Sequence, residues 1–160
     1  MRSSVVGRPG TEAVEDRLAA LRLELEAAVC IVNGENVADG VGITPKLADR
    51  LLAAGADAIT LGNHTWRRQE IAPYLATSDR VIRPANLSAD APGRGLTVVT
   101  ATDGSAVAVI NVMGSLSLEP ARSMWELIDG LVDEASAVTP VILVDVHAEA
   151  GPRFGLVLRG

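Results

Sequence analysis

The sequence predicts an α/β fold in which strands and helices alternate along the chain. In the first half, short apolar runs alternate with longer amphipathic stretches, which is typical of parallel strands joined by helical crossovers. Near the C-terminus, residues 141–146 form an apolar run with Asp145 as its one polar residue, typical of a strand buried on both faces. Polar side chains follow three of the apolar runs, where open α/β sheets gather their ligand groups.

Periodicity and helix-ending residues place the elements of the first half. Thr44 is a candidate helix cap, Pro45 suits the first helical position, and Gly55 suits the end of the same helix. An apolar stripe behind Thr11 indicates an earlier helix. The expected elements are a helix over 11–28, a strand over 29–33, a helix over 45–54, a strand over 58–61 and a short helix over 67–75.

The second half has a different pattern. Two apolar runs, 96–100 and 106–112, flank Asp103-Gly104, which is a strong hairpin signal. We expect a helix over 123–137 and a central strand over 141–146. Trp66, Tyr74 and Trp125 are expected to be packing anchors rather than substrate platforms. Because the sequence has no repeat and no long linker, we expect a single domain over 1–160.

Composition excludes several classes of function. The formal net charge of −6 argues against a broad nucleic-acid surface, although a bound metal could still attract a small phosphate ligand. No run of eighteen apolar residues is present, so no membrane span is expected. The single cysteine, Cys30, has no partner and lies in an apolar run, as expected for a protein of the reducing cytoplasm.

Five polar side chains at three strand ends are the candidate functional residues. Glu35 and Asn36 follow the first strand, Asn63 and His64 follow the second, and His147 follows the last. Carboxylate, amide and imidazole groups together suit a divalent metal, and one carboxylate can bridge two cations. Asn63 and His64 are adjacent in one tight loop, so their side chains can diverge, one binding metal while the other faces substrate. This pattern is typical of a metal-dependent phosphoesterase.

Each of these residues also has an ordinary interpretation. An Asn-His pair is common in turns, a loop glutamate is usually solvated, and a strand-end histidine often bonds to backbone. Their coincidence at three strand ends favours a site. A nucleotide-binding α/β domain is a weaker alternative, because no strand is followed by a Gly-x-Gly-x-x-Gly turn or a P-loop lysine.

The chain resembles the YmdB-like family of calcineurin-type metallophosphoesterases. The resemblance runs in unbroken order from about Val5 to Ala150. It rests on the segments Val5-Val6-Gly7-Arg8-Pro9-Gly10, Asn33-Gly34-Glu35-Asn36, Gly40-Val41-Gly42-Ile43-Thr44, Gly62-Asn63-His64-Thr65-Trp66, Arg83-Pro84-Ala85-Asn86, Pro92-Gly93-Arg94-Gly95 and His147-Ala148-Glu149-Ala150. It implies a four-layer α/β/β/α sandwich, a dinuclear divalent metal centre of iron or manganese, and hydrolysis of phosphodiesters such as 2′,3′-cyclic nucleotides by a metal-activated hydroxide.

The resemblance also implies a role for each candidate residue. Glu35 would bridge the metals, Asn36 would be a ligand or substrate contact, and Asn63 and His147 would bind metal. His64 would be the catalytic histidine, stabilising the transferring phosphoryl group or protonating the leaving oxygen. The substrate would be a small phosphodiester.

Two departures from the family pattern lead us to expect an incomplete sandwich, truncated at both ends. Ser4 stands where the family has a metal-binding aspartate. The family continues beyond Ala150 to a paired His-x-His motif, whereas His64 and His147 are the only histidines of this sequence. The alternative to an active phosphoesterase is therefore a non-catalytic remnant or pseudoenzyme that retains a phosphate-binding or oligomerising surface. Exposed sheet edges would favour association into a homo-oligomer.

Overall fold

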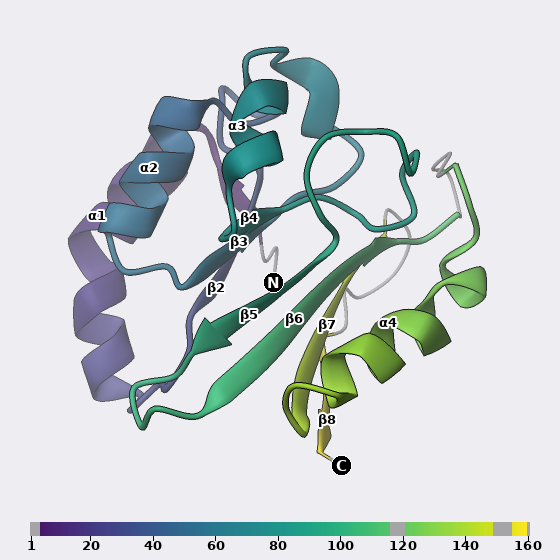
Figure 1. Cartoon of the computed structure of the whole chain (residues 1–160). Coiled ribbons are helices and arrows are strands. Elements are labelled where there is room, and N and C mark those ends of the chain that lie inside the picture. Colours follow the sequence, from purple (N-terminus) through teal and green to yellow (C-terminus); the bar gives the residue numbers. More distant parts are fainter. Residues whose placement is uncertain (1–3, 116–120, 149–154, 160) are drawn as a thin grey trace.

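The computed structural model describes residues 4–115, 121–148 and 155–159, which form two four-stranded sheets with helices outside them (Figure 1). In the first sheet all pairings are parallel, in the order β1-β2-β3-β4. Its strands are β1 (Ser4–Val6), β2 (Ile31–Asn36), β3 (Ala58–Thr60) and β4 (Val81–Ile82). The helices that connect them are α1 (Gly7–Glu24), α2 (Pro45–Ala53), the 3₁₀ turn η1 (Thr65–Arg67) and α3 (Ile71–Thr77).

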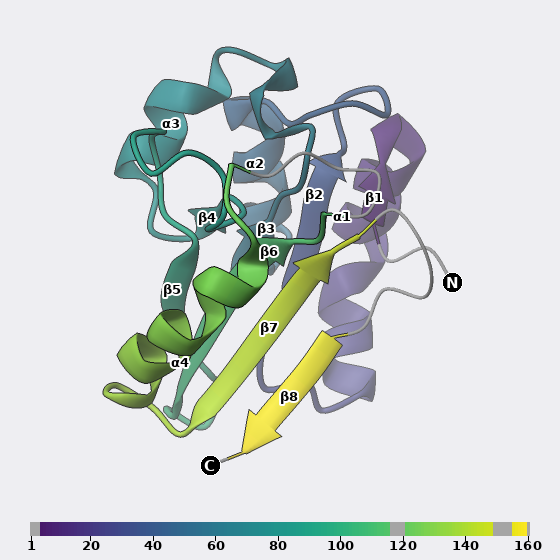
Figure 2. The ribbon, with the colours of Figure 1, turned by 90° about the vertical axis from the view of Figure 1, so that its right-hand side faces the viewer.

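The second sheet is mixed, in the order β5-β6-β7-β8. Its outer pairings are antiparallel, whereas β6 and β7 are parallel because a helical crossover joins them. Figure 2 shows this sheet from the side of α4. The elements are β5 (Leu96–Thr100), β6 (Ala106–Met113), the 3₁₀ turn η2 (Met124–Glu126), α4 (Ile128–Ser136), β7 (Val141–His147) and β8 (Gly155–Arg159).

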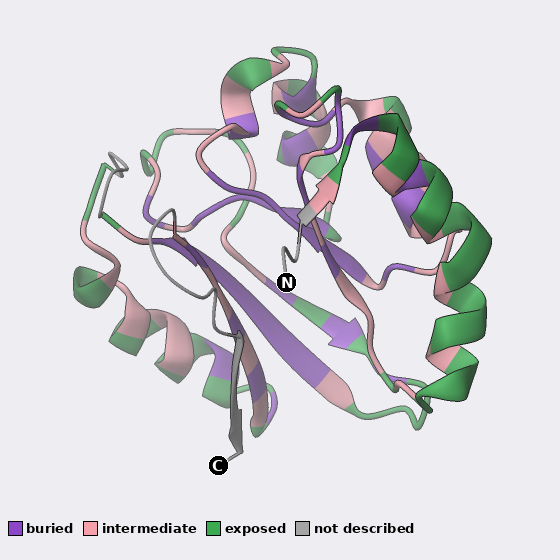
Figure 3. Ribbon diagram, turned by 180° about the vertical axis from the view of Figure 1, so that it is seen from behind, coloured by how far each residue is buried: buried purple, intermediate pink, exposed green. Residues whose placement is uncertain are grey.

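Three apolar clusters correspond to the three interfaces of an α/β/β/α sandwich. One lies between the first sheet and its helices, a second lies between the two sheets, and a third lies between the second sheet and α4. Accordingly, β3, β4 and nearly all of β6 are buried, while the helices expose their outer faces (Figure 3). The four-layer arrangement confirms the fold expected from the sequence. Among the described residues, no helix is long and apolar enough to cross a membrane.

Alternation along β6 and β7 explains how each of these largely apolar strands serves two cores. On β6, Ala108 and Ile110 pack toward α4, whereas Val107 and Val109 pack into the space between the sheets. Successive side chains of a strand point to opposite faces. The same alternation turns His147, at the end of β7, toward the first sheet.

Several element boundaries differ from the sequence-based expectation. Helix α1 begins at Gly7, four residues before the expected cap, and the Thr11 hydroxyl donates to the Gly7 carbonyl instead of capping. The expected helix over 67–75 forms as α3, displaced toward the C-terminus and preceded by a 3₁₀ turn. The expected helix over 123–137 is divided, because Leu127 separates η2 from α4. Helix α2 and the hairpin match the expectation, and Thr44 accepts from the Leu47 N–H as predicted.

The aromatic residues divide into two groups. Trp66 and Tyr74 pack against the cluster under the helices of the first sheet, as expected. Trp125 is 74% exposed, so the expectation that it anchors the core is wrong. The neighbouring Met124 contributes to the core under α4 instead, because the short 3₁₀ turn directs adjacent side chains apart.

A buried arginine holds the connection between the two sheets. Arg83, which directly follows β4, is 5% exposed and donates to three backbone carbonyls. The acceptors are Pro92 at 3.0 Å, Pro84 at 3.0 Å and Ala91 at 2.9 Å. A guanidinium is suited to this role because its donors have a fixed planar geometry. The loop that leads from the first sheet to β5 is thereby folded around one side chain.

We expect Arg83→Met to lower the free energy of unfolding by about 2–4 kcal/mol, because the carbonyls lose charge-assisted donors in a buried setting. Urea unfolding followed by circular dichroism measures this loss. The matched control is Arg94→Met, which removes an exposed ion pair with Asp79 at 2.8 Å and should change stability by about 0.5 kcal/mol or less. Equal losses in the two variants would contradict this interpretation of Arg83.

Candidate functional site

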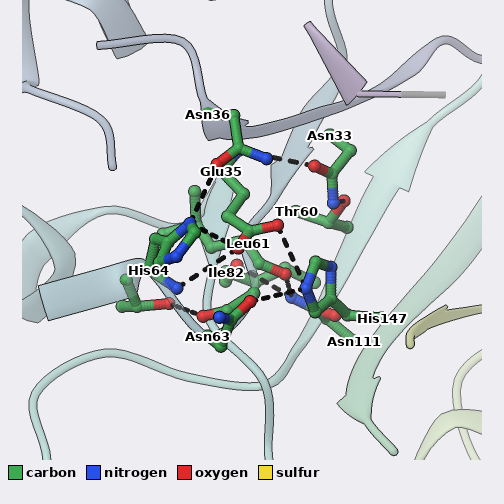
Figure 4. Close-up of polar contacts among 12 residues, drawn as sticks. Asn33, Glu35, Asn36, Thr60, Leu61, Asn63, His64, Ile82, Asn111 and His147 are labelled. Carbon is green, nitrogen blue, oxygen red and sulfur yellow. Dashed lines mark hydrogen bonds and ion pairs between the residues drawn. The ribbon is translucent and has the colours of Figure 1, made fainter. Parts of the chain in front are cut away.

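All five candidate residues meet at one end of the space between the two sheets (Figure 4). Glu35 and Asn36 come from the carboxyl end of β2, and Asn63 and His64 come from the loop after β3. His147 is the last residue of β7, in the other sheet. The sequence-based expectation that these strand ends converge is therefore correct in its geometry.

Glu35 is the centre of the cluster. Its side chain is 1% exposed and lies between two imidazoles. One carboxylate oxygen, Oε1, is 3.1 Å from His64 Nδ1, and the other, Oε2, is 3.1 Å from His147 Nε2. A carboxylate is costly to bury unless charged or hydrogen-bonding groups surround it. The two histidines provide such surroundings from opposite sides.

In each imidazole, the nitrogen that faces Glu35 also faces an asparagine oxygen. His64 Nδ1 is 2.9 Å from Asn36 Oδ1, and His147 Nε2 is 2.8 Å from Asn63 Oδ1. The cluster is therefore two similar halves, each with one imidazole, one amide oxygen and one oxygen of Glu35. This arrangement brings oxygen and nitrogen atoms that could ligate a metal together at two adjacent places.

An irregularity in β2 directs Glu35 into the site. On β1, Ser4 and Val6 are two residues apart, whereas their partners on β2, Asn33 and Asn36, are three apart. The extra residue breaks the alternation, so that two consecutive residues, Glu35 and the glycine before it, are buried. Bulges of this kind re-aim side chains near functional sites. The expectation that the strand ends at residue 33, before Glu35 and Asn36, is thus wrong: both residues belong to β2.

Gly62 gives His147 the space it occupies. A Cβ atom at Gly62 would lie 2.5 Å from Cε1 of the His147 ring and 2.6 Å from each of its nitrogens. No real Cβ approaches a ring so closely, so any larger residue would displace the imidazole. The glycine at the start of the Asn63-His64 loop is therefore required by the packing of a histidine from the other sheet.

His64 and His147 differ in accessibility. The His147 side chain is 1% exposed, which suits a ligand held away from solvent. The His64 side chain is 26% exposed, and its backbone N–H donates to Glu35 Oε1 at 3.3 Å. Within the same loop, Asn63 faces His147 while His64 faces Asn36. The two neighbouring side chains thus diverge, as their sequence pattern indicated.

Sequence reasoning missed two supporting residues. Asn33 accepts the Glu35 N–H at 3.4 Å and donates from Nδ2 to Thr60 at 3.4 Å, both at the limit of a hydrogen bond. Asn111, on β6, donates to carbonyls of the first sheet. The available signal for Asn111 was a single amide inside an apolar strand run. The available signal for Asn33 was its place in the same short segment as Glu35.

The donor types of the cluster fit a divalent metal. Buried carboxylate, imidazole and amide oxygen groups are ligands of manganese, iron and zinc alike. Within the part of the chain that the structure describes, however, no group of three or more His, Cys, Asp or Glu side chains is placed to hold a metal. The amide oxygens of Asn36 and Asn63 would therefore have to complete the two halves. The structure does not describe the side chain of Ser4, which stands at the position of the expected aspartate. It also does not describe residues 149–154.

Comparisons with known proteins agree with the architecture. The chain is 42% identical over 146 residues to a 2′,3′-cyclic-nucleotide 2′-phosphodiesterase of Bacillus subtilis (strain 168). That match covers 91% of this chain and 55% of the relative. A crystal structure of a hypothetical protein from Thermus thermophilus superposes with a TM-score of 0.82 at 33% identity, over 92% of this chain and 56% of that one.

A crystal structure of a novel phosphatase from Mycoplasma pneumoniae superposes with a TM-score of 0.78 at 26% identity, over 92% of this chain and 54% of that one. This chain therefore spans about half the length of the relatives that it matches. The model of the family described as YmdB-like protein matches residues 1–152, which is nearly the whole sequence. The chain belongs to the YmdB-like protein family.

Proposed function

We propose that this chain is a metal-dependent phosphoesterase that hydrolyses small phosphodiesters such as 2′,3′-cyclic nucleotides. The observation that carries the proposal is the buried Glu35 carboxylate, which turns one oxygen toward each of two imidazole–amide pairs. The name of the Bacillus subtilis relative supports the reaction and the substrate class. On this proposal residues 1–160 act as one hydrolase domain.

The proposed ligands follow from the two halves of the cluster. Glu35 would bridge two divalent metals, with iron or manganese as the proposed ions, and Asn36 would lie at the half that includes His64. Asn63 and His147 would be ligands of the other half, where their side chains already meet at 2.8 Å. When bound, such metals supply the Lewis acidity that phosphodiester hydrolysis requires.

His64 is the proposed catalytic residue, because it is the more exposed of the two imidazoles. Its Nδ1 edge is held by Asn36 and Glu35, which fixes the ring plane. The ring would then stabilise the phosphoryl group or donate a proton to the leaving oxygen. Burial of Glu35 and His147 keeps water away from the ligand side of the site.

The alternative is a non-catalytic remnant that retains a phosphate-binding or oligomerising surface, and the relatives named above do not favour it. Its distinguishing property would be a site that cannot bind metal. The proposed homo-oligomer is a separate matter, which sedimentation of the purified chain would test. Metal binding by the chain itself is therefore the property that distinguishes a phosphoesterase from a non-catalytic remnant.

We expect Glu35→Gln to weaken Mn²⁺ binding at least about tenfold, because the substitution removes the negative charge shared by both halves. Isothermal titration calorimetry on the metal-free chain measures the affinity and the stoichiometry. The matched control is Glu70→Gln, which changes the same functional group at an exposed position outside the cluster. If Glu35→Gln binds as tightly as the control, Glu35 is not a ligand.

We expect His64→Ala to lower phosphodiester turnover by about 10²–10⁴-fold, the range of general acid catalysis, while metal content stays close to that of the unmodified chain. Hydrolysis of a 2′,3′-cyclic nucleotide, measured beside the metal content of the same samples, separates catalysis from binding. Unchanged turnover would contradict the catalytic role. Loss of metal in proportion to turnover would show instead that His64 is a ligand.

A further inference from the structure

Asn111 is a fully buried amide in a strand that is otherwise apolar. It lies on β6 with 0% of its surface exposed, and the strand alternation turns it toward the space between the sheets. None of the proposed metal or substrate roles involves it. Its position next to the candidate site is visible in Figure 4.

The Asn111 side chain connects the second sheet to two strands of the first. Its Nδ2 donates to the Leu61 carbonyl at 2.9 Å and to the Ile82 carbonyl at 3.3 Å. Because both acceptors are carbonyl oxygens, the amide nitrogen must face them. Leu61 directly follows β3 and Ile82 ends β4, so one side chain fixes two adjacent strand ends.

Both backbone polar groups of Asn111 are hydrogen-bonded to the connection between β4 and β5. Its N–H donates to the Gly95 carbonyl, and its own carbonyl accepts the Ala85 N–H, each at 2.8 Å. The side chain therefore extends from a fixed point on β6. Any loss of its two hydrogen bonds cannot be compensated by a shift of the Asn111 backbone without breaking those contacts.

We propose that Asn111 is a positioning residue that sets the distance between the Asn63-His64 loop and His147. On one side, Leu61 is joined directly to the Gly62-Asn63-His64 loop. On the other side, Asn111 pairs with Asp145 on β7, two residues before His147. Through Asn111, the loop that carries Asn63 is held at a fixed separation from His147. Its effect on metal rests on the proposed function, whereas its effect on the two histidines does not.

The Asn111 carbonyl oxygen supports a role beyond stability. Within the described part of the chain, Oδ1 is buried without a hydrogen-bond partner. An unsatisfied buried oxygen is destabilising, and an aliphatic residue at this position would avoid that cost. A residue that leaves one of its polar atoms unsatisfied while holding two strand ends is better explained by placement of those ends than by stability.

The test compares Asn111→Leu with Thr97→Val. Thr97 also joins the sheets by one side chain, since its hydroxyl donates to the Asp79 carbonyl. Asp79 precedes β4, so this contact lies at the opposite end of β4 from Ile82. The sequence has only two histidines, so the ¹⁵N imidazole resonances of the metal-free chain at one fixed pH report on the site alone. Urea unfolding of each variant shows how far the fold itself is weakened.

We expect Asn111→Leu to shift the His147 and His64 resonances and to weaken Mn²⁺ binding about tenfold or more. Thr97→Val should lower stability but leave both resonances and Mn²⁺ affinity unchanged. If Asn111→Leu does not fold, Asn111→Ala, which is smaller and also lacks a side-chain hydrogen-bond donor, takes its place. Histidine resonances that match the unmodified chain in a folded Asn111 variant would overturn the proposal. Failure of the unmodified chain to bind Mn²⁺ would overturn the proposed function only.

Discussion

The site depends on one buried carboxylate that faces two imidazoles from different sheets. Glu35 has almost no contact with solvent, and its two oxygens are each 3.1 Å from a histidine nitrogen. Burial of a charge in a protein interior requires compensating groups at close range. Since His64 follows β3 in the same sheet as Glu35 and His147 ends β7 in the other, the His147 part of that compensation exists only while the two sheets are packed together. The complete site therefore requires the packing of the two sheets against each other.

Several features around Glu35 support the packing of the two sheets and the placement of the site residues. The bulge in β2 turns the carboxylate inward, and the absence of a side chain at Gly62 lets His147 approach. Arg83 folds the connection between the sheets, and Asn111 joins their strand ends beside the site. None of these residues needs to touch a substrate. They explain why a small set of donors can be held in two matching halves by a core made of small aliphatic side chains.

The sequence predicted what local patterns determine. Helix α2 has a cap, a proline at its start and a glycine after its end, and the hairpin has Asp103-Gly104, so both were placed correctly. Strand-end polar residues correctly indicated the convergence of Glu35, Asn63 and His147. The bulge in β2 was missed because it depends on pairing with β1, which leaves no local signal. Similarly, exposure of Trp125 depends on which face of a short 3₁₀ turn meets the core, and the role of Asn111 depends on the opposite sheet.

The most direct test of this account is a crystal of the chain grown with Mn²⁺ and measured at a wavelength where manganese scatters anomalously. The account predicts anomalous peaks within coordination distance of Glu35, with Asn63 and His147 at one peak and Asn36 nearest the other. A well-ordered crystal from Mn²⁺-containing solution with Glu35 still lying between His64 and His147, and with no anomalous peak beside it, would contradict the claim that this cluster is a metal centre.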